Sequence, residues 1–176
     1  MILVAIRHLR TPWNRAGLLQ GRVDISIEQP NRRQQKKIKD ARRKLDRLGP
    51  FNLVVCSTLR RTRQTAAAYG FKRPIQEPLL DEFDFGHYEG SEKSQLAKKL
   101  GAPWIKQPRA VKLGESVRGL ERRIRKFLRK CNRYDRVLLF GHGCWLRALK
   151  SIHKVGDARQ MNLITIRNDQ LLILRF

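Results

Sequence analysis

The sequence predicts an α/β fold, a three-layer sandwich in which helices flank a mainly parallel central sheet. Three short apolar segments predict buried strands, at Ile2–Ile6, Leu53–Cys56 and Val137–Phe140. Segments of helical composition separate them, and this alternation is typical of a parallel sheet. With 176 residues, 41% of them hydrophobic, we expect one domain over residues 1–176.

The remaining elements follow from stop signals and periodicity. Gly49-Pro50 and Gly70 each end a helix. The expected helices are Pro30–Leu48, Leu59–Tyr69, Glu92–Leu100, Glu115–Asn132 and Cys144–His153. The stretch Leu79–Ser91, rich in acids, aromatics and glycine, is expected to be irregular. Leu163–Ile166 and Leu171–Leu174 are expected to close the fold as a strand pair with a turn at Asn168-Asp169.

The charge balance favours anionic ligands. The chain carries 39 Lys and Arg against 15 Asp and Glu, a net charge of +24. Phosphoesters, nucleic acid, polyphosphate and an acidic membrane surface all fit this sign. The basic residues are densest in Arg32–Arg47 and Arg118–Arg136, where a solvated helix face is the simplest interpretation. Nucleic acid is compatible with the charge, but no nucleic-acid-binding motif occurs and aromatics are only 7%.

Several classes of protein are disfavoured. The three cysteines, Cys56, Cys131 and Cys144, form neither a disulfide framework nor a metal-ligand pattern. No stretch is long enough to cross a bilayer. The apolar start at Met1–Ile6 lacks a preceding basic region and a following cleavage site. We therefore expect a cytoplasmic protein.

Polar clusters follow all three predicted strands. Arg7-His8 comes after the first, Ser57–Arg61 after the second and Gly141–Gly143 after the third. In open α/β sheets, ligands bind at the carboxyl ends of the strands. The sequence therefore predicts a ligand site where these three clusters meet.

These residue types suit phosphoryl chemistry. Arg7 and Arg61 can present planar forks to phosphate oxygens from two strand ends. His142 lies between two glycines that allow close backbone approach. The imidazole of His8 is a competent nucleophile toward phosphorus. Glu82 can serve as proton donor to the leaving oxygen, provided that its surroundings hold a proton on it.

Five blocks of the sequence carry distinctive motifs: Arg7–Asn14 continuing to Gln20-Gly21, Ser57–Ala66, Leu80–Gly90, Gly114–Ser116 with Arg123, and Leu138–Gly143 with Arg147–Leu149. In this order they resemble the signature of the histidine phosphatase superfamily, which includes cofactor-dependent phosphoglycerate mutase. That family reads R-H-G-x-T-x-W-N, S-x-L-x-R-[AT]-x-Q-T-A, L-x-E with G-x-x-E-G, G-E-S with a later Arg, and a second-histidine block. The five blocks cover nearly the whole chain.

The resemblance implies specific roles. His8 would be the phosphorylated residue, and Glu82 the acid for the leaving group and then the base that activates water. The expected phosphate- and substrate-binding residues are Arg7, Asn14, Gln20, Gly21, Arg61, His142 and Gly143. The reaction would be two in-line transfers through phosphohistidine on a phosphorylated small-molecule or anionic substrate, with no metal and no cofactor. Arg60 and Arg63 are expected on the helix surface, and His87 and His153 outside the site.

Leu9 stands where the family nearly always has glycine after the nucleophilic histidine. Two outcomes are open: Leu9 adopts a compatible conformation, or it narrows the pocket. Phosphoglycerate mutases usually carry longer covering segments than the stretch from Glu92 to Leu113, so we predict a phosphatase. The alternatives are a mutase-type phosphoryl transferase and a basic nucleic-acid-binding protein on a degenerate phosphatase scaffold.

Overall fold

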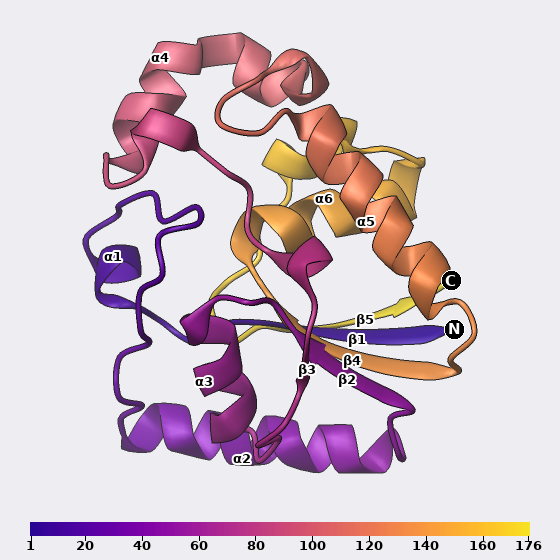
Figure 1. Cartoon of the computed structure of the whole chain (residues 1–176). Helices are drawn as coiled ribbons and strands as arrows, with labels where there is room; N and C mark the ends of the chain where they lie inside the picture. The colour runs from indigo at the N-terminus through magenta and orange to yellow at the C-terminus, as the bar shows by residue number, and fades with distance from the viewer.

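The computed structural model describes residues 1–176 and contains a five-stranded sheet in the order β3-β2-β4-β1-β5. Strands β1, β2, β3 and β4 are parallel, and β5 runs antiparallel to β1 at one edge (Figure 1). The strands are β1 Ile2–Arg7, β2 Leu53–Cys56, β3 Ile75–Gln76, β4 Arg136–Gly141 and β5 Leu171–Arg175. The central pair, β1 and β4, therefore brings its carboxyl ends, Arg7 and Gly141, side by side.

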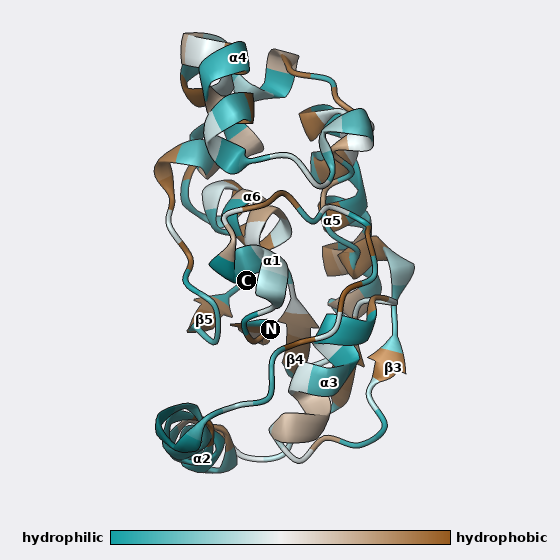
Figure 2. Ribbon diagram, turned by 90° about the vertical axis from the view of Figure 1, so that its left-hand side faces the viewer, coloured by the Kyte–Doolittle hydropathy of each residue, from teal (hydrophilic) through white to brown (hydrophobic).

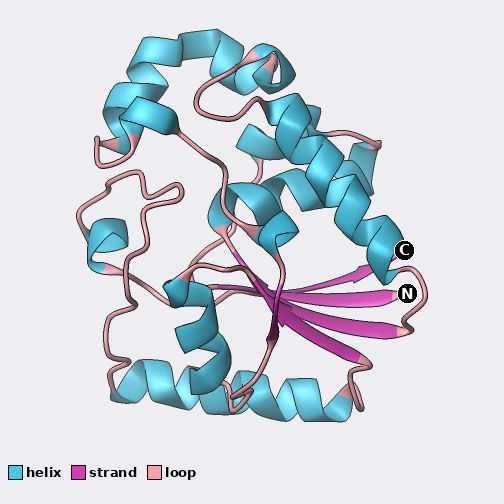
Figure 3. Ribbon diagram, viewed as in Figure 1, coloured by secondary structure: helices cyan, strands magenta, loops and turns pink.

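Helices cover both faces of the sheet. Helices α2 and α3 lie on one face, α5 and α6 on the other, and α4 lies beyond α5 and α6 (Figure 3). The helices are α1 Pro12–Arg15, α2 Arg32–Arg47, α3 Arg60–Ala68, α4 Lys93–Lys106, α5 Val117–Cys131 and α6 Gly143–Val155, with short 3-10 turns at Pro78–Leu80, Gly86–Tyr88, Pro108–Ala110 and Ala158–Leu163. None of them is both long and apolar enough to traverse a lipid bilayer.

The strands divide their side chains between two hydrophobic clusters. Alternate residues of a strand point to opposite faces. Val4 and Ile6 of β1 pack with α2 and α3, whereas Leu3 and Ala5 pack with α5 and α6. This two-sided burial explains why β1 and β4 appear in the sequence as continuous apolar runs. The predicted three-layer α/β class is confirmed.

Most predicted elements are confirmed, but one helix is longer than expected and one strand was not expected. Helix α4 continues to Lys106 rather than ending near Leu100, with a kink at Gly101, whose positive φ of 56° breaks the helical geometry. Two exposed residues, Ile75 and Gln76, form the edge strand β3, and nothing in their composition predicts it.

The predicted pairing of Leu163–Ile166 with Leu171–Leu174 is wrong. Only the second segment is a strand, and its partner is β1. The turn at Asn168-Asp169 bonds directly to the end of β1, where Asp169 N donates to Arg7 O and Arg7 N to Gln170 O. β1 therefore takes the pairing that the hairpin would have used, and Ile164, Thr165 and Ile166 instead line a cavity.

The two chain ends meet at the opposite end of the sheet from the polar strand ends. The amino group of Met1 donates to the carbonyl oxygen of Phe176 at 2.7 Å, and Figure 1 shows both termini together at the right. The carboxyl ends of β1 and β4 face the other way, toward α1 and α4.

Candidate active site

A cavity of about 350 Å³ opens at the carboxyl ends of β1 and β4. Its walls come from both predicted strand ends, from the Leu18–Gly21 loop, from α4 and from the start of α6. The lining residues are Arg7, His8, Asn14, Leu18, Leu19, Gln20, Gly21, Arg61, Glu82, Phe85, Lys93, Leu96, Ala97, Trp104, Gly143, Cys144, Arg147, Ile164, Thr165 and Ile166. Eight of the nine predicted site residues are therefore together, and His142 is the exception.

One ring nitrogen of His8 is hydrogen-bonded and the other has no protein partner. Its Nδ1 lies 2.7 Å from the carbonyl oxygen of Leu9, which can only accept, so Nδ1 carries the proton. Nε2 then carries the lone pair, and it has no protein partner. Burial lowers the pKa of His8 well below 6.5, and the charges of Arg7 and Arg61 lower it further. The ring is therefore neutral at physiological pH, as attack on phosphorus requires.

Leu9 does not narrow the cavity. Its side chain is buried in the hydrophobic cluster under α2, with Val4 and Ile6. The backbone N–H of Leu9 donates to Thr65 Oγ1 at 2.9 Å, and its φ is not positive. Of the two outcomes open from the sequence, the compatible conformation is the one observed.

Arg7 lines the cavity and is held at one end of its guanidinium. Its Nη1 donates to the carbonyl oxygen of Ile166 at 2.6 Å, and its Nε is buried with no partner. Burial lowers the pKa of Arg7. A Cβ at Gly143 would lie 3.1 Å from Arg7 Cζ, so glycine permits this close approach. A cation that lies beside a cavity and has an N–H group without an acceptor favours an anionic ligand.

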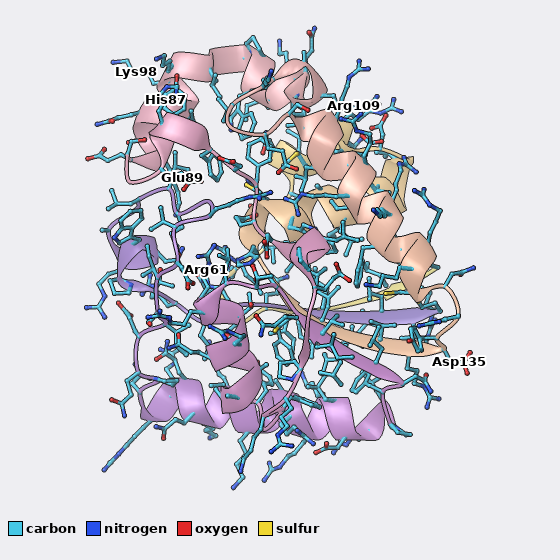
Figure 4. The ribbon with its side chains drawn as sticks, in the orientation of Figure 1. Arg61, His87, Glu89, Lys98, Arg109 and Asp135 are labelled. Atoms are coloured by element: carbon cyan, nitrogen blue, oxygen red, sulfur yellow. The ribbon has the colours of Figure 1, made fainter.

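Arg61 is the fully buried arginine of its helix, whereas Arg60 and Arg63 are exposed, as predicted. Figure 4 places Arg61 between α3 and the segment that carries Glu89. Its Nη1 and Nη2 donate to the carbonyl oxygens of Val23 and Gly21 at 2.7 and 2.6 Å. Burial lowers the pKa of Arg61 to about 10, partly offset by Glu82, so the group stays charged. The guanidinium is fixed rather than mobile.

Glu82 lies at the N-terminus of α6. Its Oε1 accepts the N–H groups of Phe83 and Trp145 at 2.9 and 3.0 Å, and its Oε2 accepts that of Cys144 at 3.0 Å. Three such donors, with the helix dipole, stabilise a carboxylate. The carboxyls near Glu82 in sequence are used elsewhere, since Asp81 accepts from Thr58 and Glu89 from Arg22 N.

A partly buried ion pair, Arg123–Glu115, holds the Glu82 segment on the side away from the cavity. Arg123 of α5 donates to the carbonyl oxygens of Leu79 and Glu82 at 2.9 and 3.1 Å, and also to that of Asp81. Its Nε bonds Glu115 Oε1 at 2.7 Å. These contacts fix the main chain from which Glu82 projects, so Arg123 is a positioning residue for the carboxylate.

Comparison with known proteins agrees with this geometry. The family model described as histidine phosphatase superfamily (branch 1) matches residues 3–176. The chain belongs to the histidine phosphatase superfamily.

Individual relatives are distant. A Schizosaccharomyces pombe protein named as a probable phosphatase is 32% identical over 108 residues, which are 58% of this chain and 49% of that protein. Phosphoserine phosphatase 1 of Hydrogenobacter thermophilus is 26% identical over 84% of this chain and 73% of its own length. A solved structure of an open reading frame product from Mycobacterium tuberculosis superposes with a TM-score of 0.83 at 24% identity, covering 99% of this chain and 91% of that one. The structural likeness shows the fold, and the curated relatives support a phosphatase enzyme.

The second histidine of this histidine phosphatase lies behind the cavity wall. Arg61 Nε donates to His142 Nδ1 at 3.1 Å, so Nε2 carries the proton and faces Ser57 Oγ at 2.7 Å. The rings of His142 and His8 are 5.3 Å apart. Both ring nitrogens of His142 are therefore hydrogen-bonded to protein side chains, one to Ser57 and the other to Arg61. Its direct contact with phosphate stays a prediction, and its observed contact fixes Arg61.

Asn14, Gln20 and Gly21, which were predicted to contact the substrate, also line the cavity. Asn14 Oδ1 accepts from Thr11 N and from Asn168 Nδ2 at 3.2 and 3.1 Å, which leaves its Nδ2 as a donor. Gln20 Oε1 is buried without a partner. Gly21 has a φ of +50°, and a Cβ there would lie 1.8 Å from Glu89 Oε1. These positions suit ligand contact, which stays a prediction.

Sequence reasoning missed part of the wall of this histidine phosphatase. Lys93 at the start of α4 and Arg147 on α6 add two cations. Leu18, Phe85, Leu96, Trp104, Ile164 and Ile166 are among the residues that supply an apolar side. Arg147 was visible as part of the second-histidine block, whereas the turn at Asn168 and the carbonyl of Ile166 carry no residue-type signal. His87 and His153 are exposed and outside the cavity, as predicted.

Proposed function

We propose that the chain hydrolyses phosphomonoesters through a phosphohistidine formed on His8. One observation carries this proposal. The Leu9 carbonyl fixes the proton of His8 on Nδ1, so the lone pair of Nε2 is free in a cavity that Arg7 and Arg61 also line. Nucleophilic catalysis requires a neutral, oriented imidazole next to cations that bind the phosphoryl oxygens.

The first transfer breaks the ester bond. His8 Nε2 attacks phosphorus in line with the leaving oxygen, the N–P bond forms and the P–O bond breaks. Glu82 gives a proton to the departing alkoxide. The second transfer returns a proton to Glu82, which balances the cycle.

The second transfer regenerates the enzyme. Glu82, now ionised, takes a proton from water as the water oxygen attacks phosphorus and the N–P bond breaks. Inorganic phosphate leaves and the lone pair returns to His8 Nε2. Arg7 and Arg61 balance the charge of the equatorial oxygens in both steps.

The walls of the cavity favour a small phosphorylated substrate. A volume of about 350 Å³ accommodates a phosphate and a modest leaving group. Lys93 and Arg147 supply cations beyond those expected to bind the phosphoryl group, and Leu96 and Trp104 supply apolar contact. A compact anionic phosphomonoester therefore fits the site better than a neutral sugar phosphate.

Hydrolysis is favoured over mutase-type transfer because the covering segment between Glu92 and Leu113, which holds α4 and the turn after it, is short. The two are separated by the fate of the phosphoryl group. With a phosphorylated hydroxy acid as substrate, we expect inorganic phosphate as the main product. Isomerised substrate with negligible phosphate release would reassign the chain to phosphoryl transfer between substrate hydroxyls.

The direct experiment measures phosphate release from a panel of substrates. In a second arm, the reaction with a ³²P-labelled phosphomonoester is quenched rapidly and the protein is tested for bound label. Label retained on the protein in alkali and lost in acid identifies phosphohistidine. We expect His8→Ala to abolish the label and to lower turnover by on the order of 10³-fold or more. His87→Ala, at an exposed ring outside the cavity, should change neither. A fully active, labelled His8→Ala protein would disprove the mechanism, and a chelator should not change the rate.

A further inference from the structure

The outer face of α2 carries a dense array of cations. Nine of its sixteen residues are Arg or Lys, against the two acids Asp40 and Asp46. Each acid pairs with one neighbour, in Arg42–Asp46 and Arg43–Asp40. Seven cations have no ion pair, and all are exposed: Arg32, Arg33, Lys36, Lys37, Lys39, Lys44 and Arg47.

The seven cations without an ion pair make no side-chain hydrogen bond and do not line the active site. Arg42 differs from them, because its Nη1 donates to Tyr69 O and its guanidinium lies over the Phe71 ring. The contacts of α2 with the sheet come from Ile38 and Leu45, on its opposite side. No α2 residue lines the active-site cavity. Like charges one turn apart on a helix repel and lower its stability. Figure 2 shows α2 as a strongly hydrophilic element at the periphery, and Figure 4 shows nitrogen-tipped side chains extending from it away from the sheet.

The chemistry of the face selects its partner. Its exposed side chains include no apolar or aromatic residue, so it has neither an anchor for a bilayer interior nor a platform for stacking unpaired bases. The sixteen residues of α2 form a rod of about 24 Å. Arg32, Lys36 and Lys39 follow one another at helical spacing along its first half. A duplex strand presents a phosphate about every 3.4 Å, so about seven phosphates span the length of the rod. We propose that the outer face of α2 docks on the phosphate backbone of duplex nucleic acid without reading its sequence.

Helix α5 provides a matched comparison. It is also basic, but three of its cations pair with acids, in Arg123–Glu115, Arg125–Glu121 and Lys130–Glu77. Its exposed cations without an ion pair include Arg122, Lys126 and Arg129, at the same relative spacing as Arg32, Lys36 and Lys39. Removing either set changes the net charge by the same amount. A difference between the two variants therefore reports the location of binding rather than total charge.

The test measures binding of a 20-base-pair DNA and a 20-base-pair RNA duplex by fluorescence anisotropy across a series of salt concentrations. The slope of log K against log salt changes by about 0.9 for each phosphate that the protein no longer neutralises. Arg32→Gln/Lys36→Gln/Lys39→Gln should flatten it by about 2.7, the value for three phosphates, and weaken binding at least about tenfold at 0.1 M salt. Arg122→Gln/Lys126→Gln/Arg129→Gln should change the slope by less than about one. Both variants should keep wild-type hydrolysis of an aryl phosphate, which shows that they fold.

Four results would overturn the proposal. Equal loss of affinity in the two variants would show a response to net charge alone. Failure of the wild type to bind either duplex near physiological salt would remove the partner. A strong preference between two unrelated sequences would show base readout. Binding to phosphatidylserine vesicles that depends on α2, without duplex binding, would assign the face to a membrane surface.

Discussion

The active-site cavity and the outer face of α2 both concentrate cations, in opposite ways. In the cavity, Arg7 and Arg61 are held by main-chain carbonyl oxygens. On α2, the cations are exposed and mostly have no partner. Fixed, enclosed charges give a particular geometry, whereas exposed charges on flexible side chains give a field that salt screens. Single substitutions should therefore matter greatly in the first region and little in the second.

After His8→Ala, the largest effect is expected from Arg61→Ala. It removes a charged fork from the cavity, leaves two carbonyls without donors and frees His142. We expect kcat/KM for an aryl phosphate to fall by about 10³-fold, as when a main oxyanion donor is removed. Arg63→Ala, on the same helix but exposed, removes the same charge and should leave the rate unchanged. Similar losses in both variants would mean that overall charge, not geometry, attracts the substrate.

A smaller loss is expected from Glu82→Gln. The amide is close in shape but can neither give nor take a proton in the reaction, so turnover should fall by about 10²-fold or more. The loss should be greater for an alkyl phosphate than for p-nitrophenyl phosphate, whose leaving group departs without a proton. Steady-state rates on the two substrates, with Glu92→Gln as the exposed control, measure this. An equal loss on both would show that Glu82 acts through charge alone.

Leu9→Ala should separate stability from catalysis. The Leu9 side chain is buried in the cluster under α2 and not in the cavity. We expect the free energy of unfolding to fall by about 2–4 kcal/mol, as for other buried leucines. Denaturant unfolding measures this, and kcat/KM at 25 °C should stay close to wild type. A marked gain or loss of activity would place Leu9 in the pocket after all.

The smallest effect concerns pH. Burial lowers the pKa of both His8 and His142 well below 6.5, the usual value that they regain on unfolding. Below pH 6.5 the unfolded chain therefore binds protons that the folded chain does not. Stability should be full above that pH and fall as pH drops toward 5. Thermal unfolding across pH 5–8 measures the slope, which His142→Asn should reduce and His87→Gln should not.

Much of this arrangement could be predicted from sequence, because apolar runs and motif spacing are local signals. The apolar runs locate the ends of β1 and β4. The motif spacing selects Arg61 over Arg60 and singles out Glu82. The predicted hairpin between Leu163–Ile166 and Leu171–Leu174 was wrong because β5 pairs with β1 instead. These two strands are far apart in the sequence, and no local pattern indicates such a pairing. The engagement of His142 by Ser57 and Arg61 was missed for the same reason, since it depends on side chains 85 and 81 residues away.

The hydrogen bond between Met1 and Phe176 has a practical consequence. Because the ends touch at the end of the sheet away from the cavity, a short peptide could join them and new termini could be opened elsewhere. The turn at Gly49-Pro50, between α2 and β2, is a surface position suited to such a cut. A permuted enzyme of this kind would place affinity tags or reporter domains beside α2 while leaving the route into the cavity clear.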